Sequence, residues 1–212
     1  MKHGTLQFQV HEPDYSDLPE KHYDWSSVYG EVSELLPEDT PDPLGKHVTL
    51  THYVDANLFH NTLTGRSVTG ILHMLNATPI DWYSKKQATV ETATYGSEFV
   101  AAQTCIEQII DLRTTLQYLG VPIRHQSYMF IDNKLVVNLS LILHAKLHKR
   151  HTALSFHCVC EAVASKSVGF YFIPGADNPA DVLSKHWSYG SNWKNLRCLL
   201  FWKGDTAEIE EG

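Results

Sequence analysis

Four acidic side chains stand at positions where a carboxylate can take part in chemistry. Asp55 ends an expected β-strand, and Asp132 directly follows the short apolar strand at 127–131. Glu98 lies near the start of a long helical pattern, and Asp181 falls in the first turn of an expected last helix. Because strand ends and helix starts meet along one edge of an α/β sheet, these carboxylates can converge in one crevice.

Such a cluster favours bound cations, since four unneutralised carboxylates repel one another and raise each other's pKa values. Ligands that are all oxygen favour Mg²⁺, with Mn²⁺ as the other candidate, over zinc. Two such ions about 3.5–4 Å apart can hold the attacking and the leaving oxygen of a phosphodiester. A phosphodiester-cleaving site with two metal ions is therefore one hypothesis.

Each acid also has a purely structural explanation. Asp55 can start a turn, and Asp132 can mark a strand exit before a capping Asn133. Glu98 and Asp181 can pair with helix dipoles. The intervals of 43, 34 and 49 residues between the acids match no short motif. Spacing alone leaves both interpretations open.

The elements that must position these acids follow from hydrophobic periodicity and turn residues. Three consecutive β-rich segments with short connections predict an antiparallel meander. Helical and strand patterns alternate along the rest of the chain. The expected elements are strands at 47–55, 67–75 and 79–84, a helix at 94–119, a strand at 127–131, helices at 133–139 and 146–165, a strand at 168–173 and a last helix from 178.

Capping residues mark the ends of two of these helices. Gly120 followed by Pro122 predicts the end of the long helix. Asn178, Pro179 and Asp181 predict the N-cap, N1 and N3 positions of the last helix. The whole order predicts an α/β fold with a five-stranded mixed sheet, three antiparallel strands and then two parallel ones, flanked by helices.

Length and charge indicate one folded domain between two acidic ends. The chain has 212 residues, 43% of them hydrophobic, and a net charge of −7. Residues 1–45 carry −8 and residues 203–212 carry −3, which leaves +4 on residues 46–202. The total charge argues against a nucleic-acid partner, whereas the charge of the middle region favours one.

Membrane and disulfide-dependent proteins fit this sequence poorly. No stretch approaches the roughly 18 apolar residues that a membrane span needs, and the first five residues lack an apolar secretory segment. We expect no membrane partner and an intracellular location. The cysteines lack zinc-site spacing and are expected to be reduced, structural thiols at positions 105, 158, 160 and 198.

Six short segments in a fixed order carry a family resemblance. They are Tyr53–Asn57, Arg66–Gly70, Trp82–Gln87, Gly96–Ala101, Ile131–Asn133 and Ala180–Lys185. Together they resemble the ribonuclease H domain of copia-type LTR retrotransposon polyproteins. The resemblance covers 46–187. The acidic, Pro-rich lead-in at 1–45 is loosely similar to the segment that follows reverse transcriptase, and 188–212 remains as a C-terminal tail.

The resemblance implies a ribonuclease H-like fold with two Mg²⁺ ions, or Mn²⁺, held by the same four acids. It implies that Asp55 bridges both ions, that Asp181 completes the site of the attacking water, and that Glu98 and Asp132 hold the ion beside the leaving 3′ oxygen. The implied reaction is endonucleolytic hydrolysis of the RNA strand of an RNA–DNA hybrid, leaving 3′-hydroxyl and 5′-phosphate ends. A reverse transcriptase domain in the same polyprotein is the implied partner, and the cytoplasm or a virus-like particle the implied location.

Selection of RNA requires contacts to the 2′-hydroxyl in a shallow minor groove. The candidates are backbone groups after Asp55, the Asn57 side chain and Ser97. Trp82 is expected in the core, with stacking on a sugar or base as the alternative. The phosphates need cations, and the candidates are Arg66, Lys85, Lys86, Lys146, Lys149 and Arg150. The last three can equally form a solvated helix face.

Several positions depart from the family pattern. Asn57 stands where an acid is usual, Cys160 where Arg is usual, and residues 141–143 are unusually apolar. Residues 174–178 lack the histidine that cellular ribonucleases H carry near their last Asp. Two alternatives stay open: a degenerate, catalytically inactive nucleic-acid-binding remnant, and a DDE-type integrase- or transposase-like nuclease, which usually uses three acids.

Overall fold

A five-stranded mixed sheet forms the centre of the computed structural model, which describes residues 12–19, 24–34, 38–61, 65–91, 93–141 and 150–185. The strands stand in the order β3-β2-β1-β4-β5. They are β1 (Leu50–Asn61), β2 (Arg66–Leu75), β3 (Thr78–Lys86), β4 (Ser127–Ile131) and β5 (Val168–Phe172). The first three pair antiparallel and the last two add parallel, which confirms the predicted sheet.

The antiparallel strands are longer than the sequence pattern indicates. Asn76 takes a φ of 54° in the turn between β2 and β3, a conformation that asparagine tolerates better than most residues. β1 continues past Asp55 to Asn61 because its pairing with β2 continues there. The prediction that Asp55 ends its strand is therefore wrong, and Asp55 lies inside the central strand.

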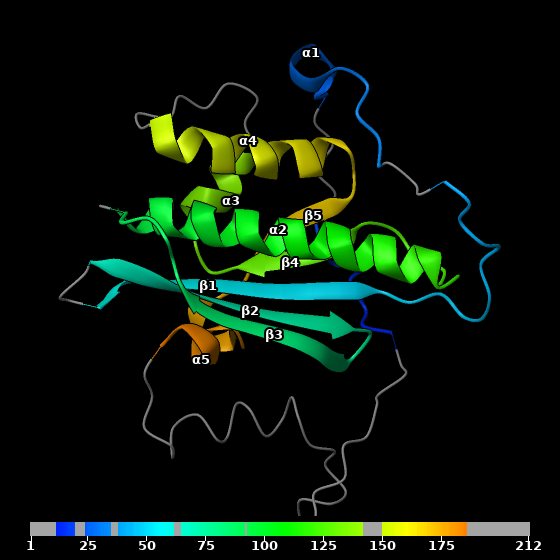
Figure 1. The fold of residues 1–212 in the computed structure, drawn as a ribbon, viewed down its shortest axis with the longest axis horizontal. Helices are drawn as coiled ribbons and strands as arrows, with labels where there is room; N and C mark the ends of the chain where they lie inside the picture. Colours follow the sequence, from blue (N-terminus) through cyan, green and yellow to red (C-terminus); the bar gives the residue numbers. More distant parts are fainter. Residues whose placement is uncertain are drawn as a thin grey trace, which may run out of the picture.

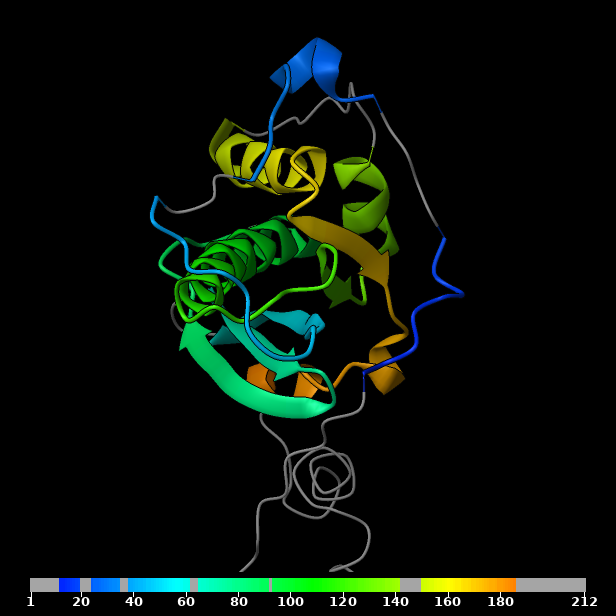
Figure 2. The ribbon, with the colours of Figure 1, turned by 90° about the vertical axis from the view of Figure 1, so that its right-hand side faces the viewer.

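Helices cover both faces of the sheet (Figures 1 and 2). The long helix α2 (Thr94–Tyr118) lies against one face, with α3 (Lys134–Ser140) and α4 (Arg150–Ala164) beside and above it. The short helix α5 (Asp181–Ser184) lies against the opposite face, over β1, β2 and β3. Residues 142–149 lie outside the described residues, so the start of the helix predicted at 146–165 is not described.

The core lies between α2 and the sheet. Phe99, Ile106 and Ile109 of α2 are fully buried in one hydrophobic cluster with Val54 and Ile131 of the sheet. Their spacing of three to seven residues is the helical periodicity that the sequence shows. This packing fixes the N-terminal turns of α2 relative to the middle of β1.

The predicted end of α2 is confirmed, and the predicted start of α5 is shifted. Gly120 takes a φ of 71°, and the Val121 N–H donates to the Leu116 carbonyl, as in a glycine-terminated helix. Asp181 is the first residue of α5, so the N-cap prediction for Asn178 is wrong. The Asn178 amide instead donates to the Val54 carbonyl and holds this turn against β1.

The lead-in, which contains the one-turn helix α1 (Ser26–Tyr29), contacts the domain. Trp25 is 8% exposed and belongs to the core cluster. Glu34 accepts hydrogen bonds from Nε and Nη2 of Arg113 on α2, at 2.5 and 2.6 Å. These contacts anchor the described lead-in residues to α2 and the core. The tail at 188–212 lies outside the described residues.

The exposure of Trp82, the state of the cysteines and the character of the helices also bear on the sequence predictions. Trp82 is 67% exposed, so its predicted core position is wrong: β3 is an edge strand with one face open. Cys105, Cys158 and Cys160 are free thiols, as predicted. Within the part of the chain that the structure describes, no helix combines the length and apolarity that crossing a membrane requires.

Candidate active site

Parallel pairing of β1 with β4 brings Asp55 and Asp132 together. Val54 pairs with Ile131, and the two acids are the next residues along these neighbouring strands. Asp55 is 2% exposed, whereas Asp132 is half-buried directly after the end of β4. The predicted strand-exit position of Asp132 is confirmed.

Glu98 joins these two acids from α2. It is the fifth residue of the helix, one turn from its start, and is buried beneath the helix. Asp55, Glu98 and Asp132 each offer a carboxylate oxygen, and these oxygens all lie within 4.8 Å of one another. We call these three residues the carboxylate cluster.

Burial and mutual repulsion act on the carboxylate cluster. Burial, followed by the charges of Asp55 and Asp132, raises the pKa of Glu98 well above its usual range. Burial and the charge of Asp55 also raise the pKa of Asp132. A backbone N–H of Ala56 bonds Glu98, but Glu98 Oε2 is buried without a hydrogen-bond partner among the described residues. This orphan oxygen and the shared repulsion create a place for a cation.

Asp181 is not a member of the carboxylate cluster, and it does not line the cavity beside it. Among the described residues, the acids whose oxygens lie within 4.8 Å of one another do not include it. Its carboxylate instead pairs with Lys185 one helical turn later. The charge of Lys185 partly offsets the rise in the pKa values of both Glu98 and Asp132. The structure thus brings three of the four predicted acids together and ties the fourth to a neighbouring lysine.

The seating of α5 over Asp55 depends on a glycine in the strand below. Gly70 pairs with Asp55, and a Cβ atom at Gly70 would lie 2.6 Å from the Ala180 carbonyl oxygen and 2.8 Å from the Ser184 nitrogen. Only a residue without a side chain allows this approach. The Ser184 hydroxyl donates to Oδ2 of Asp55, and the Ser84 hydroxyl donates to a backbone carbonyl of α5 at 2.6 Å.

The carboxylate cluster opens into a cavity of about 640 Å³, which we call the carboxylate depression. On one side, a Cβ atom at Gly175 would lie 2.9 Å from Oδ2 of Asp132, so the turn after β5 closes tightly on this acid. The other described residues that line the depression are Ala56, Asn57, Leu58, Thr94, Asn133, Lys134, Leu135, Phe172 and Lys185.

Some of the predicted nucleic-acid contacts lie near this depression. Asn57 lines it, and Asn57, Val68 and Lys86 form one row across β1, β2 and β3. Strands lie about 4.8 Å apart, which places the Lys86 backbone about 10 Å from that of Asn57. Lys85 and Arg66 are exposed near the same end of the strands.

Other predicted contacts are not brought to the depression. Ser97 is fully buried, and its hydroxyl donates to the Thr94 carbonyl at 2.8 Å, so its side chain serves the helix. Lys146 and Lys149 lie outside the described residues, and nothing is described of the Arg150 side chain at the start of α4.

Sequence reasoning missed four residues of this site. Ser184 and Lys185 follow Asp181 by three and four residues, a helical spacing that could have placed them beside it. Lys134 and Phe172 come from α3 and β5, and the Lys134 ammonium lies 4.6 Å from the centre of the Phe172 ring. No sequence signal links that second pair.

Curated relatives from plant transposons resemble part of this chain, and no family model matches it. The retrovirus-related Pol polyprotein from transposon TNT 1-94 of Nicotiana tabacum is 29% identical over 143 residues, which are 66% of this chain. The corresponding polyprotein from transposon RE2 of Arabidopsis thaliana is 26% identical over 143 residues. Each match spans only 10% of the relative's length.

Solved structures share the fold. The N-terminal ribonuclease H domain of a Mycobacterium tuberculosis protein aligns with 71% of this chain and 98% of its own, with a TM-score of 0.50 and 13% identity. LC11-RNase H1, solved in complex with an RNA/DNA hybrid, aligns with 64% of this chain and 93% of its own, with a TM-score of 0.50 and 16% identity. The chain has a ribonuclease H fold, and the predicted resemblance to retrotransposon polyproteins is confirmed.

Proposed function

We propose that this chain hydrolyses the RNA strand of RNA–DNA hybrids. The observation that carries the proposal is the carboxylate cluster, in which acids from β1, α2 and β4 meet beside an open depression. Retrotransposon relatives and the ribonuclease H fold support a nuclease that acts on nucleic acid.

The donor set fits divalent cations. Asp55, Glu98 and Asp132 offer oxygens alone, and the buried Oε2 of Glu98 has no hydrogen-bond partner among the described residues, so a bound cation would satisfy it. We infer that these acids hold two Mg²⁺ ions, or Mn²⁺, with Asp181 as the fourth ligand once it leaves Lys185. Ions bound there would stabilise negative charge on the phosphodiester oxygens and activate a water molecule.

Neighbouring groups hold the acids for this task. The Ser184 hydroxyl orients Asp55, and the Ala56 N–H orients Glu98. Lys185 supplies positive charge to the cluster from its border. Because Ser184 and Lys185 belong to the same turn as Asp181, small shifts of α5 change the charge and the geometry of the site together.

Substrate contacts extend from the depression onto the antiparallel strands. Asn57 lines the depression and is placed to contact a 2′-hydroxyl together with backbone groups after Asp55. Lys85, Lys86 and Arg66 offer exposed cations for phosphates along the same end of β2 and β3. In this arrangement the hybrid lies over the ends of the antiparallel strands.

The polyprotein context is part of the proposal. Because the chain spans about a tenth of the relatives it matches, we propose that it works within a longer polyprotein that carries a reverse transcriptase domain. Two of the departures from the family pattern lie away from the candidate site, which supports an active enzyme, whereas a third, Asn57, lines the depression without belonging to the carboxylate cluster. Cys160 and Leu141 are buried in the core cluster, away from the residues that line the carboxylate depression.

A nuclease assay tests the proposed function. Purified protein in Mg²⁺ is expected to cut the RNA strand of a labelled hybrid and to leave a double-stranded DNA of matched sequence intact. Asp132→Asn is expected to abolish cutting while the protein stays folded. Asp111→Asn, at an exposed position of α2, is the matched control and should cut normally. Full activity in Asp132→Asn, or no cutting by the parent in either Mg²⁺ or Mn²⁺, would refute the proposal.

A further inference from the structure

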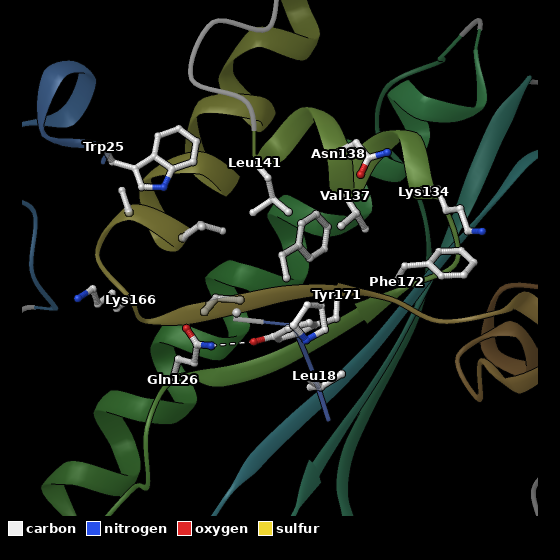
Figure 3. Close-up of a pocket in the computed structure, with 16 residues that line it drawn as sticks. Leu18, Trp25, Gln126, Lys134, Val137, Asn138, Leu141, Lys166, Tyr171 and Phe172 are labelled. Atoms are coloured by element: carbon white, nitrogen blue, oxygen red, sulfur yellow. Dashed lines mark hydrogen bonds between the residues drawn. The ribbon is translucent and has the colours of Figure 1, made fainter. Parts of the chain in front are cut away.

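A second cavity of about 540 Å³ adjoins the carboxylate depression, and we call it the side cavity. It runs along β5, between α3, the end of α4 and the lead-in residues Leu18 and Trp25 (Figure 3). Lys134 and Phe172 line both hollows, so the two meet at this pair. A strand that leaves the carboxylate depression past Lys134 and Phe172 would reach the side cavity next.

The charge of the side cavity favours an anion. Its charged residues, among those that the structure describes, are Lys134 and Lys166, and no carboxylate lines it. Figure 3 shows the two lysines on opposite sides of the cavity. In a chain with a net charge of −7, and next to three clustered acids, a cavity with cations alone is selective for negative charge.

The remaining lining is mostly apolar and includes aromatic rings. The Phe172 ring is 36% exposed at the junction of the two hollows, and Tyr171 follows the cavity along β5. Gln126 donates to the Tyr171 hydroxyl at 2.9 Å, and the Asn138 amide lies on the α3 side (Figure 3). Aromatic rings with nearby cations are the usual platform for unpaired bases and their phosphates.

We propose that the side cavity holds unpaired nucleotides that continue the strand bound at the carboxylate depression. Lys134 and Lys166 contact phosphates, and Phe172 stacks on a base. The inference rests on the proposed function and adds a preference for hybrids with a single-stranded flank. A peptide added to the free edge of β5 would use the same space, but the paired lysines and the continuity with the depression favour nucleic acid.

Binding measurements on a non-cutting background test the inference. Asp132→Asn protein is titrated against a fluorescent hybrid of about 16 base pairs, blunt or extended by about four unpaired nucleotides at the 5′ or the 3′ end of the RNA strand. Fluorescence anisotropy is expected to show about tenfold tighter binding for one of the extended hybrids, since stacking of one base is worth that much. Lys134→Met with Lys166→Met should remove this gain, and Lys166→Met alone, at a residue that lines the side cavity and not the carboxylate depression, should reduce the gain and leave blunt binding within about twofold. Lys46→Met, at an exposed position outside both cavities, is the matched control and should keep the gain.

The outcomes separate this inference from the proposed function. Equal affinity for blunt and extended hybrids overturns the inference, and so does a gain that survives loss of both lysines. Phe172→Ser provides a second variant. If this variant still binds the extended hybrid more tightly by the same factor, Phe172 does not stack on a base. If neither hybrid binds and the parent protein does not cut, both the proposed function and the inference fail together.

Discussion

Replacing Gly70 by alanine should damage the site through backbone geometry alone. The new Cβ would lie 2.6 Å from the Ala180 carbonyl oxygen, 2.8 Å from the Ser184 nitrogen and 3.0 Å from the Leu183 carbonyl carbon. All three atoms are backbone, so no side-chain rotation can relieve the contact. α5 must move by roughly 0.5–1 Å to reach ordinary carbon–oxygen contact distances of about 3.2–3.5 Å.

The size of both effects follows from this displacement. Overpacking of this kind costs about 1–3 kcal/mol, which at about 2–4 °C per kcal/mol lowers the melting temperature of a domain of this size by about 2–12 °C. The same shift separates Ser184 from Asp55 and moves Asp181, and a misplacement of about 1 Å can cost roughly 100-fold in rate. We therefore expect a modest loss of stability with a large loss of hybrid cutting.

Thermal unfolding and cutting of a blunt hybrid, measured on the same preparation, check this prediction. Gly169→Ala is the control, because its Cβ would meet the Gln126 and Tyr171 side chains, away from the carboxylate cluster. That variant can lose stability but should keep its cutting rate. A Gly70→Ala protein with the parent's melting temperature and cutting rate would show that α5 does not depend on this close approach.

Three further predictions concern charge. Glu98→Gln should raise the melting temperature in a chelator, because it removes a buried charge that repels its neighbours, and should abolish both the Mg²⁺-induced stabilisation and cutting. Glu34→Gln should lower the free energy of unfolding by about 2 kcal/mol in urea titrations, because it leaves the buried Arg113 guanidinium without a counter-charge. Acid should destabilise the protein below about pH 6.5, by up to about 1.4 kcal/mol per pH unit for each of His52 and His73, because burial lowers both pKa values and only the unfolded chain takes up those protons. Urea midpoints at pH 7.5 and 5.5 measure this slope.

Each of these predictions has its own counter-result. No change in the melting temperature of Glu98→Gln in chelator would contradict the repulsion within the cluster. Glu12→Gln is the control for Glu34, since its partner Arg124 is half exposed and the pair should contribute less than about 1 kcal/mol. Replacing both His52 and His73 by leucine should flatten the pH dependence, and an unchanged slope would assign it to other groups.

The histidine prediction depends on one hydrogen-bond arrangement. His73 Nε2 lies 2.9 Å from the Gln108 carbonyl oxygen and donates to it, so the neutral ring leaves Nδ1 free to accept. His52 Nδ1 lies 2.7 Å away and donates to that acceptor. A second proton on His73 would put two N–H groups face to face, and a second proton on His52 would leave a buried Nε2–H without a partner among the described residues, which explains why the pair stays neutral.

The order and type of the elements could be predicted from the sequence because they rest on local signals. Hydrophobic periodicity predicted the strands and α2, and Gly120 predicted where that helix ends. Asp132 could be placed because a strand exit is a local feature. The end of β1 could not be predicted, because pairing with β2 extends that strand past Asp55.

The sequence by itself determined which acids are present, their order along the chain and the elements that carry them. The tertiary structure decided which acids meet: parallel pairing aligned Asp55 with Asp132, and the packing of α2 brought Glu98 to them. It also paired Asp181 with Lys185 and joined the Lys134–Phe172 pair to both hollows. Convergence of this kind depends on strand register and on helix packing between segments more than 30 residues apart in the chain, and local residue patterns favour such an arrangement without fixing it.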